Sequence, residues 1–353
     1  EILRCLVGSE MCIRDRLLIG GYTHYPVGIP AKAGEGVALF REENNTVEKI
    51  IPAENPSFLA SDGSGGFFAL KESDSGLLQH FVPNSSEGSF SSAAKIAFPG
   101  AGSCHLCVKD GKTVYVSNYL SGTLSVIGVT DTEMILLQNL EFSGSGPVEK
   151  RQEHSHIHSS ILSESGHELF VADLGGDKIY RYAVEKDGSL TPFAQQPYIL
   201  TPAGSGPRHM AWNKNILYVT AELSNEILSI RFDSDGIGSV VSEIQTTAEK
   251  GSQILTAHIC FSESRNKIYA CVRGTDEIVW LVPESDPAVL TLQGRCSSGG
   301  KFPRHFLLRE REDKIYCANQ LSSELTVFDL NAEGVPRLKC AVPMPGAAMV
   351  LSV

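Results

Sequence analysis

The chain has 353 residues, of which 42% are hydrophobic and 20% charged, and a formal net charge of −11. This composition is typical of a globular protein, and the negative charge argues against nucleic acid or an anionic membrane as the main partner. No apolar run reaches 18 residues, so no transmembrane helix is predicted. The nine cysteines are scattered along the chain without the spacing of a zinc site, which favours a reducing, cytoplasmic compartment.

Residues 1–16 (EILRCLVGSEMCIRDR) lack the pattern of everything that follows them. They have neither the apolar region nor the small-residue cleavage site of a signal peptide. The segment CLVGSEMCIRDR resembles a translated sequencing-adapter sequence. We therefore expect residues 1–16 to lie outside the fold, with a natural start slightly upstream of Leu17, and a single domain to span residues 17–353.

From Leu17 onward, two short apolar runs joined by a polar turn recur along the chain, as expected for repeated β-hairpins. The residue that follows each second run recurs at spacings of 46 to 55 residues: Tyr22, Glu72, Asn118, Asp173, Glu222, Arg273 and Asn319. Seven copies of about fifty residues predict an all-β, seven-bladed β-propeller with four antiparallel strands in each blade. A β-sandwich would not need seven equal copies.

The expected strands follow in chain order. First strands are predicted at residues 56–61, 104–109, 158–163, 208–212, 257–262 and 304–308, and alternating third strands at 122–129, 177–184, 225–232, 276–282 and 323–330. A looser fourth strand completes each copy. The last apolar run, residues 347–353, is left over after the seventh copy. We expect it to form the inner strand of the first blade, which would close the ring and remove free sheet edges.

Antiparallel pairing places the start of each first strand beside the end of the second strand, so both sets of residues should meet at one mouth of the central channel. The strand starts carry His105, His156, His158, Arg208, His209, His258, Arg304 and His305. Any one of these histidines could simply be a turn residue, but their repetition favours a site. Arginine, histidine and carboxylate groups together suit a small anionic ligand and proton transfer near neutral pH.

The same residues could also be read as a metal site. His156 and His158 lie on one face of a strand and could ligate a cation. Arg208 and Arg273, however, should lie nearby and would repel it. The sequence therefore predicts neither a metal nor any other cofactor.

The segments GSGPRH, FPRH, HSHIHS, VSNYLSGTLSV, VADLGGDKIYRY and ANQLSSELTVF resemble the lactonase family of seven-bladed propellers. That family holds the bacterial propeller-type 6-phosphogluconolactonases and the fungal 3-carboxy-cis,cis-muconate lactonizing enzymes. The resemblance runs from about Leu17 to Val353 and implies a catalytic set of four residues: His158, Arg208, Glu222 and Arg273. One departure is Ser155, where the family often has proline before its His-x-His segment.

The resemblance implies a carboxylic-ester hydrolase of the pentose phosphate pathway that opens 6-phosphogluconolactone. Either Glu222 or His158 would be the base, and Arg208 and Arg273 would hold the oxyanion or the substrate anion. The expected substrate-binding residues are His105, Asn118, His156, His209, Arg304, His305 and Asn319. We expect a monomer or a weak homo-oligomer. Two alternatives stay open: a muconate-type cycloisomerase that uses the same residues without consuming water, and a non-catalytic propeller that binds a partner protein.

Overall fold

The computed structural model describes residues 16–25, 29, 31–84, 88–130 and 133–352. The expected adapter-like segment lies outside these residues except for Arg16. Arg16 is the first residue of a strand rather than part of a separate segment: it pairs with Arg41, and its Nε lies 2.8 Å from Glu48 Oε2.

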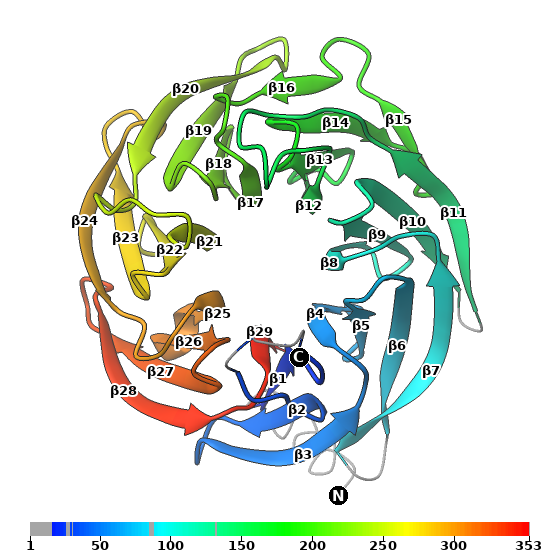
Figure 1. Cartoon of the computed structure of the whole chain (residues 1–353), viewed down its shortest axis with the longest axis vertical. Coiled ribbons are helices and arrows are strands. Elements are labelled where there is room, and N and C mark those ends of the chain that lie inside the picture. The colour runs from blue at the N-terminus through cyan, green and yellow to red at the C-terminus, as the bar shows by residue number, and fades with distance from the viewer. Residues whose placement is uncertain (1–15, 26–28, 30, 85–87, 131–132, 353) are drawn as a thin grey trace, which may run out of the picture.

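Seven sheets surround a central axis, and each sheet is one blade of the propeller (Figure 1). From the inside outward, the first blade has β29 (Ala347–Ser352), β1 (Arg16–Gly21), β2 (Gly36–Arg41) and β3 (Thr46–Pro52). The second has β4 (Pro56–Ser61), β5 (Phe67–Lys71), β6 (Gly76–Asn84) and β7 (Ser89–Phe98), and the third β8 (Ser103–Lys109), β9 (Thr113–Asn118), β10 (Thr123–Val129) and β11 (Met134–Glu141).

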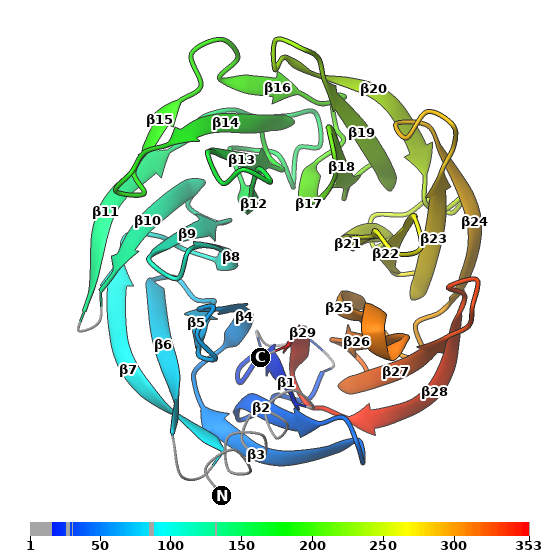
Figure 2. The same ribbon diagram turned by 180° about the vertical axis from the view of Figure 1, so that it is seen from behind.

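The fourth blade has β12 (Ile157–Leu162), β13 (Glu168–Asp173), β14 (Lys178–Val184), β15 (Leu190–Pro192) and β16 (Tyr198–Leu200). The fifth has β17 (Pro207–Asn213), β18 (Ile216–Ala221), β19 (Glu226–Phe232) and β20 (Gly238–Gln245), and the sixth β21 (Leu255–Ser262), β22 (Lys267–Arg273), β23 (Glu277–Pro283) and β24 (Leu290–Ser297). The seventh has β25 (Pro303–Arg309), β26 (Lys314–Asn319), β27 (Glu324–Leu330) and β28 (Pro336–Pro343), with the short 3₁₀ helix η1 (Glu310–Glu312) between its first two strands. The predicted seven-bladed propeller is confirmed, and Figure 2 shows the same ring from behind.

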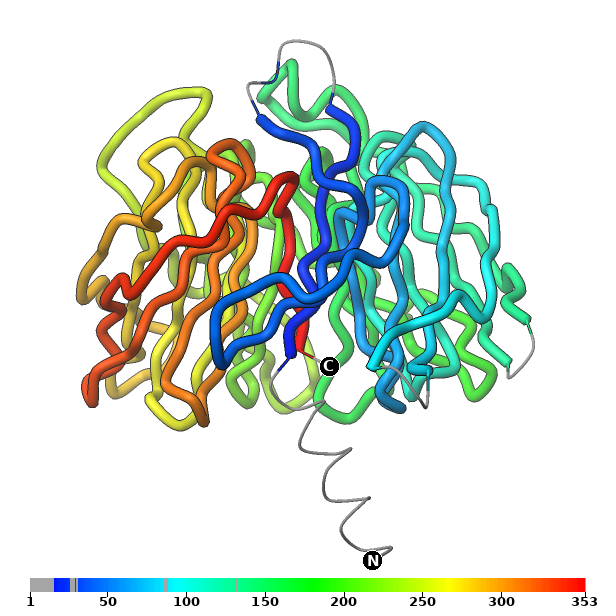
Figure 3. The backbone as a smooth tube through the Cα atoms, turned by 90° about the horizontal axis from the view of Figure 1, so that it is seen from below, coloured from blue at the N-terminus to red at the C-terminus, as the bar shows by residue number. Residues whose placement is uncertain are grey.

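The two ends of the described chain meet in the first blade, which confirms the predicted ring closure. β29 pairs antiparallel with β1, with Leu18 opposite Leu351 and Ile19 opposite Val350. In Figure 3 the red C-terminal strand runs directly beside the blue N-terminal one. The closing strand covers the edge of β1 that would otherwise be free to pair with another chain.

The hydrophobic core lies between neighbouring blades. The second strands are buried along nearly their whole length, as in β9 and β18, because a blade packs against each face. One core cluster, for example, joins Ile216 and Tyr218 of the fifth blade to Ile268 and Val272 of the sixth. Such packing fixes the inner strands relative to one another, and therefore fixes the side chains around the channel.

The fourth blade departs from the common pattern at its outer edge. β15 and β16 both pair with β14, so they share the place of one fourth strand. Pro192 and Pro197 bracket the gap between them, and a proline cannot donate a hydrogen bond to a neighbouring strand. In the part of the chain that is described, no helix is long and apolar enough to cross a membrane.

Candidate active site

A β-bulge at the start of all seven inner strands turns side chains toward the channel. The pairing register shifts between Ile157 and Ser159 in β12, and between Pro207 and Met210 in β17. Equivalent shifts occur at the starts of β4, β8, β21, β25 and β29. A bulge interrupts the alternation of side chains and re-aims them. This explains how the consecutive residues Arg208 and His209 both contact groups around the channel.

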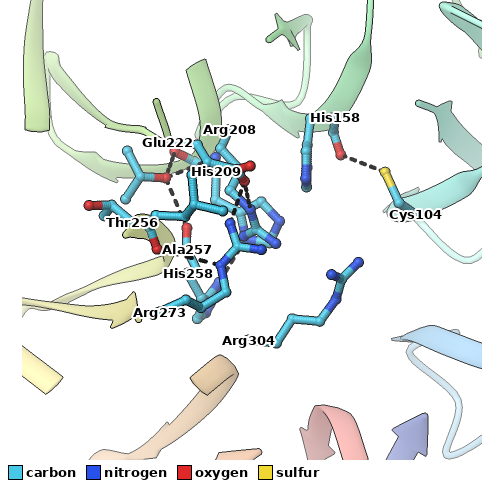
Figure 4. Close-up of polar contacts among 12 residues, drawn as sticks. Cys104, His158, Arg208, His209, Glu222, Thr256, Ala257, His258, Arg273 and Arg304 are labelled. Carbon is cyan, nitrogen blue, oxygen red and sulfur yellow. Dashed lines mark hydrogen bonds and ion pairs between the residues drawn. The ribbon is translucent and has the colours of Figure 1, made fainter. Parts of the chain in front are cut away.

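Glu222 lies at the centre of a cluster of arginines beside the fifth blade (Figure 4). Its Oε2 is 2.8 Å from Arg208 Nε and 2.6 Å from Arg273 Nη2, and its Oε1 is 2.5 Å from Arg151 Nη2. The Glu222 side chain is only 2% exposed. One carboxylate therefore meets three guanidinium groups, which leaves an excess of positive charge in a largely buried site.

The charges in this cluster shift one another's pKa. Burial alone would raise the pKa of Glu222, but Arg273, Arg208 and Arg151 together hold it well below its usual value. Burial, followed by repulsion from Arg273, lowers the pKa of Arg208 to about 9. At neutral pH Glu222 is therefore ionised and Arg208 remains a cation.

His158, near the start of β12, is the predicted catalytic histidine. It is 6% exposed, and its Nδ1 has no hydrogen-bond partner among the described residues. Its ring meets the edge of Tyr119 at a centroid distance of 5.7 Å, and its backbone carbonyl oxygen accepts a hydrogen bond from Cys104 Sγ at 3.3 Å. Burial, followed by repulsion from Arg208, lowers the pKa of His158 well below its usual value, so its ring is neutral at neutral pH.

A cavity of about 440 Å³ opens beside the cluster. His158, Glu222, Arg273 and Arg151 line it, together with Tyr22, Glu72, Cys104, Tyr119 and Arg304. Its volume lies within the usual range for small-molecule sites.

Arg304, in β25 of the seventh blade, also lines the cavity and lies apart from the Glu222 cluster (Figure 4). Among the described residues its ion pair is a long one, of 3.6 Å between Nη2 and Glu72 Oε2, and its guanidinium lies 5.7 Å from the centroid of the Tyr22 ring. Tyr22 Oη donates a hydrogen bond of 2.8 Å to the same Glu72 oxygen. The cavity therefore has a second cationic group, separate from the Glu222 cluster.

The predicted substrate-binding residues separate into three groups. Arg304 lines the cavity, whereas His105, His209 and His305 do not. The three histidines pack with His258 and Phe58 in the channel: His258 stacks on His305 at 3.9 Å between ring centroids, and Phe58 lies 4.4 Å from His105.

The third group is built into the blades or their loops. Asn118 and Asn319 are fully buried, and their side-chain amides donate to hydroxyls of the third strand, at 3.0 Å to Ser125 Oγ and 2.8 Å to Thr326 Oγ1. His156 does not line the cavity either; its Nδ1 contacts the Tyr119 carbonyl oxygen at 2.8 Å. These side chains hold neighbouring segments together.

Sequence reasoning missed Arg151 and Tyr119. Arg151 lies in the loop before β12, outside the strand pattern from which the candidate residues were taken, and its Nη2 also donates to Tyr119 Oη at 3.3 Å. Its position just before the HSHIH segment was the available signal. Tyr119 directly follows the predicted Asn118, and it lines the cavity whereas Asn118 does not.

The fold and cavity define a seven-bladed propeller with a cationic, carboxylate-centred site at one mouth of its channel. Residues 16–351 match the family described as "Lactonase, 7-bladed beta-propeller", and the chain belongs to that family. The resemblance seen in the sequence is thereby confirmed.

Sequence similarity to named proteins covers most of the chain. It is 28% identical to a 6-phosphogluconolactonase of Formosa agariphila, across 86% of this chain and 90% of the relative. It is also 28% identical to a 6-phosphogluconolactonase of Bacillus subtilis, across 86% and 83%. The structure of a periplasmic gluconolactonase of Pseudomonas aeruginosa superposes with a TM-score of 0.83 at 22% identity, covering 95% of this chain and 98% of the other, which shows the shared fold.

Proposed function

We propose that this protein is a lactonase that hydrolyses a sugar lactone, with 6-phosphogluconolactone as its substrate. The observation that carries the proposal is the Glu222 carboxylate held by three guanidinium groups beside a cavity that also contains the neutral His158. Such a site offers cations for an oxyanion and an imidazole for proton transfer. The names of the two 6-phosphogluconolactonase relatives support the same substrate.

His158 is the better general base of the two candidates. His158 lines the cavity, and its neutral imidazole can accept a proton from water as the water oxygen attacks the lactone carbonyl carbon. Glu222 has a pKa held well below its usual value, and a carboxylate so strongly stabilised is a weak base near neutral pH. In this mechanism Glu222 positions the arginines.

The remaining steps follow from the same groups. Arg273 and Arg151 line the cavity and stabilise the oxyanion of the tetrahedral intermediate. Arg208 does not line the cavity and holds the Glu222 carboxylate through their ion pair. The intermediate collapses by breaking the bond between the acyl carbon and the ring oxygen. The proton taken up by His158 passes to that leaving oxygen, which gives the open hydroxy acid.

Arg304 is the candidate contact for the substrate phosphate. Its long contact to Glu72 leaves guanidinium donors free for a stronger, doubly charged partner. The cavity volume of about 440 Å³ accommodates a molecule of sugar size between the two cationic groups. The free thiols of Cys104, Cys107 and Cys271, among others, fit a protein that works in the cytoplasm.

The test is hydrolysis of freshly generated 6-phosphogluconolactone by the purified chain, followed by enzymatic detection of 6-phosphogluconate. We expect a rate well above spontaneous opening, and a rate near the spontaneous one for Arg273→Ala. The exposed Arg295→Ala, on the outer strand of the same blade, is the matched control and should keep the rate. A wild-type rate equal to the spontaneous one would reject the proposal, and cyclisation of a muconate by the same preparation would favour the cycloisomerase.

A further inference from the structure

Three potential ligand atoms converge in the loop that leads into β12, outside the residues that line the cavity. The Nε2 atoms of His154 and His156 lie 3.8 Å and 3.3 Å from Glu153 Oε1, and all three atoms lie within 4.8 Å of one another. The two imidazole rings lie at a centroid distance of 4.2 Å, with 43° between their planes. This group differs from the pair His156 and His158, which the sequence analysis considered and set aside because of the expected nearby arginines.

The hydrogen bonds of the two histidines determine which ring nitrogen carries the proton. His154 Nδ1 lies 2.7 Å from the Ser155 carbonyl oxygen, and His156 Nδ1 lies 2.8 Å from the Tyr119 carbonyl oxygen. A carbonyl oxygen can only accept, so each Nδ1 must donate. In the neutral rings each Nε2 is then left with a free lone pair, directed toward the other two ligand atoms.

Three acceptors close together need a positive charge between them. A single proton would satisfy only one pair, whereas a metal ion would satisfy all three atoms. His156 is 2% exposed, and its Nε2 has no hydrogen-bond partner among the residues that the structure describes, so water does not readily supply that charge or bond. The side chains of Glu153 and His154 are each 49% exposed, which leaves an approach open from solvent.

We propose that Glu153, His154 and His156 form a binding site for a first-row divalent metal ion of the Zn²⁺ type. Two imidazole nitrogens and one carboxylate oxygen are a ligand set that Zn²⁺ uses, with water at the open position. Donation of Nδ1 to a backbone carbonyl is the usual support of a metal-binding histidine. The His156 backbone N–H also donates to Asp173 Oδ1 at 2.8 Å, which anchors the loop.

Arg151, two residues before Glu153, is engaged elsewhere. Its Nη2 lies 2.5 Å from Glu222 Oε1, and among the described residues it forms no ion pair with Glu153. The His156 ring stacks on Tyr119 at 4.2 Å and 15° between planes, so the proposed metal lies beyond that ring and apart from the reacting groups. The metal has no part in the lactonase mechanism proposed above, and the two proposals can fail separately.

The test uses the full-length chain after removal of metals with a chelator. Co²⁺, added as a spectroscopic probe, should give a visible d–d absorption band that saturates at one ion per chain, and Zn²⁺ should abolish the band by displacement. Calorimetry with Zn²⁺ should give the same stoichiometry. Mg²⁺ should not compete, because it prefers oxygen ligands.

His154→Asn and Glu153→Gln change exposed side chains, so both variants should fold normally. Each should weaken Zn²⁺ binding at least about tenfold, since loss of even a supporting residue has that effect. His167→Asn, an exposed histidine on the same blade, is the control and should bind as the wild type does. Absence of the Co²⁺ band, or equal affinity of His154→Asn and His167→Asn, would overturn the proposal, and the first outcome would mean that a proton alone occupies the site.

Discussion

Arg208 and Glu222 form a buried ion pair across the hairpin of β17 and β18, with 2.8 Å between Nε and Oε2 and both side chains 2% exposed. Arg208 lies at the bulged start of one strand, and Glu222 follows the end of the other. The backbone N–H of Glu222 donates to the Gly206 carbonyl oxygen at 2.8 Å, which closes this end of the hairpin. The fold itself therefore brings the two charges together.

Glu222→Gln should destabilise the protein as well as inactivate it. The change removes the one carboxylate, among the described residues, with which Arg208 and Arg273 form ion pairs. Unpaired buried charges of this kind typically cost about 3 to 5 kcal/mol. The free energy of unfolding in urea measures the loss, and kcat/KM for the lactone measures the effect on the site.

The matched control for this change is Glu226→Gln at the partly exposed start of β19, where the side chain accepts a hydrogen bond from Gln245. It should alter the free energy of unfolding by no more than about 0.5 kcal/mol. A Glu222→Gln protein as stable as Glu226→Gln would mean that the arginines do not need this carboxylate.

His158→Asn separates the two candidate bases. If His158 takes the proton from water, kcat should fall by about 10² to 10⁴ while KM changes little. Glu222→Asp keeps the carboxylate and should lose less activity. The opposite order of kcat, with His158→Asn the more active variant, would assign the base to Glu222.

The repeat pattern predicted the blades, the closing strand and the meeting of Arg208 with Glu222, because all three depend on strand order and pairing. It did not predict which inward residues border the cavity. Tyr119, not Asn118, occupies the place of Glu222: its backbone N–H donates to the Gly102 carbonyl oxygen, as that of Glu222 donates to Gly206, whereas Asn118 pairs with Ser103 as Ala221 pairs with Pro207. The approximate repeat spacing did not fix this offset of one residue, which decides whether a side chain borders the cavity or bonds to the next strand.

The sequence also did not predict the site residues that lie in loops. Arg151 reaches Glu222 from a segment without strand pairing, so no register argument could place it. The metal-type group at Glu153 and His154 also depends on the turn of this loop. The sequence had instead paired His156 with His158, on the assumption that the strand already began there, whereas β12 begins at Ile157.

Arg304→Gln should reduce the preference for a phosphorylated substrate. A charge-assisted contact to phosphate is worth about 1.5 to 3 kcal/mol, so kcat/KM for 6-phosphogluconolactone should fall about tenfold or more. The loss for unphosphorylated gluconolactone should be smaller. The ratio of the two kcat/KM values is the measurement.

Lys301→Gln is the control for Arg304→Gln, because Lys301 precedes the same strand but its side chain is 73% exposed and pairs with Asp276. Its substrate ratio should match the wild type. An unchanged ratio in Arg304→Gln would place the phosphate elsewhere in the cavity.

The free energy of unfolding should decrease as the pH falls below about 6.5. Burial, followed by the charge of Arg208, lowers the pKa of His305 to about 3 and that of His209 well below its usual value of 6.5. At a pH between the lowered pKa of the folded protein and the usual value of about 6.5 in the unfolded chain, the unfolded chain binds more protons than the folded one. Acid therefore favours unfolding. Each such histidine contributes a slope of about 1.4 kcal/mol per pH unit.

Urea denaturation between about pH 7.5 and 5 measures this slope above the range where carboxylates titrate. His305→Gln should reduce the slope relative to the wild type, and His167→Gln, which alters an exposed histidine, should not. A flat profile over this range in the wild type would show that the channel histidines titrate normally in the folded protein.

Closure of the ring by β29 predicts the effect of changes in that strand. Val350 is 1% exposed and belongs to one core cluster with Leu17 and Ile19 of β1. Val350→Asp would place an unpaired charge in this core and should reduce the free energy of unfolding by about 3 to 5 kcal/mol. Leu338→Asp on β28 is the control, because Leu338 is 53% exposed, and it should leave stability nearly unchanged. Equal stability of the two variants would mean that the first blade holds together without its C-terminal strand, so that closure would not be what stabilises the propeller.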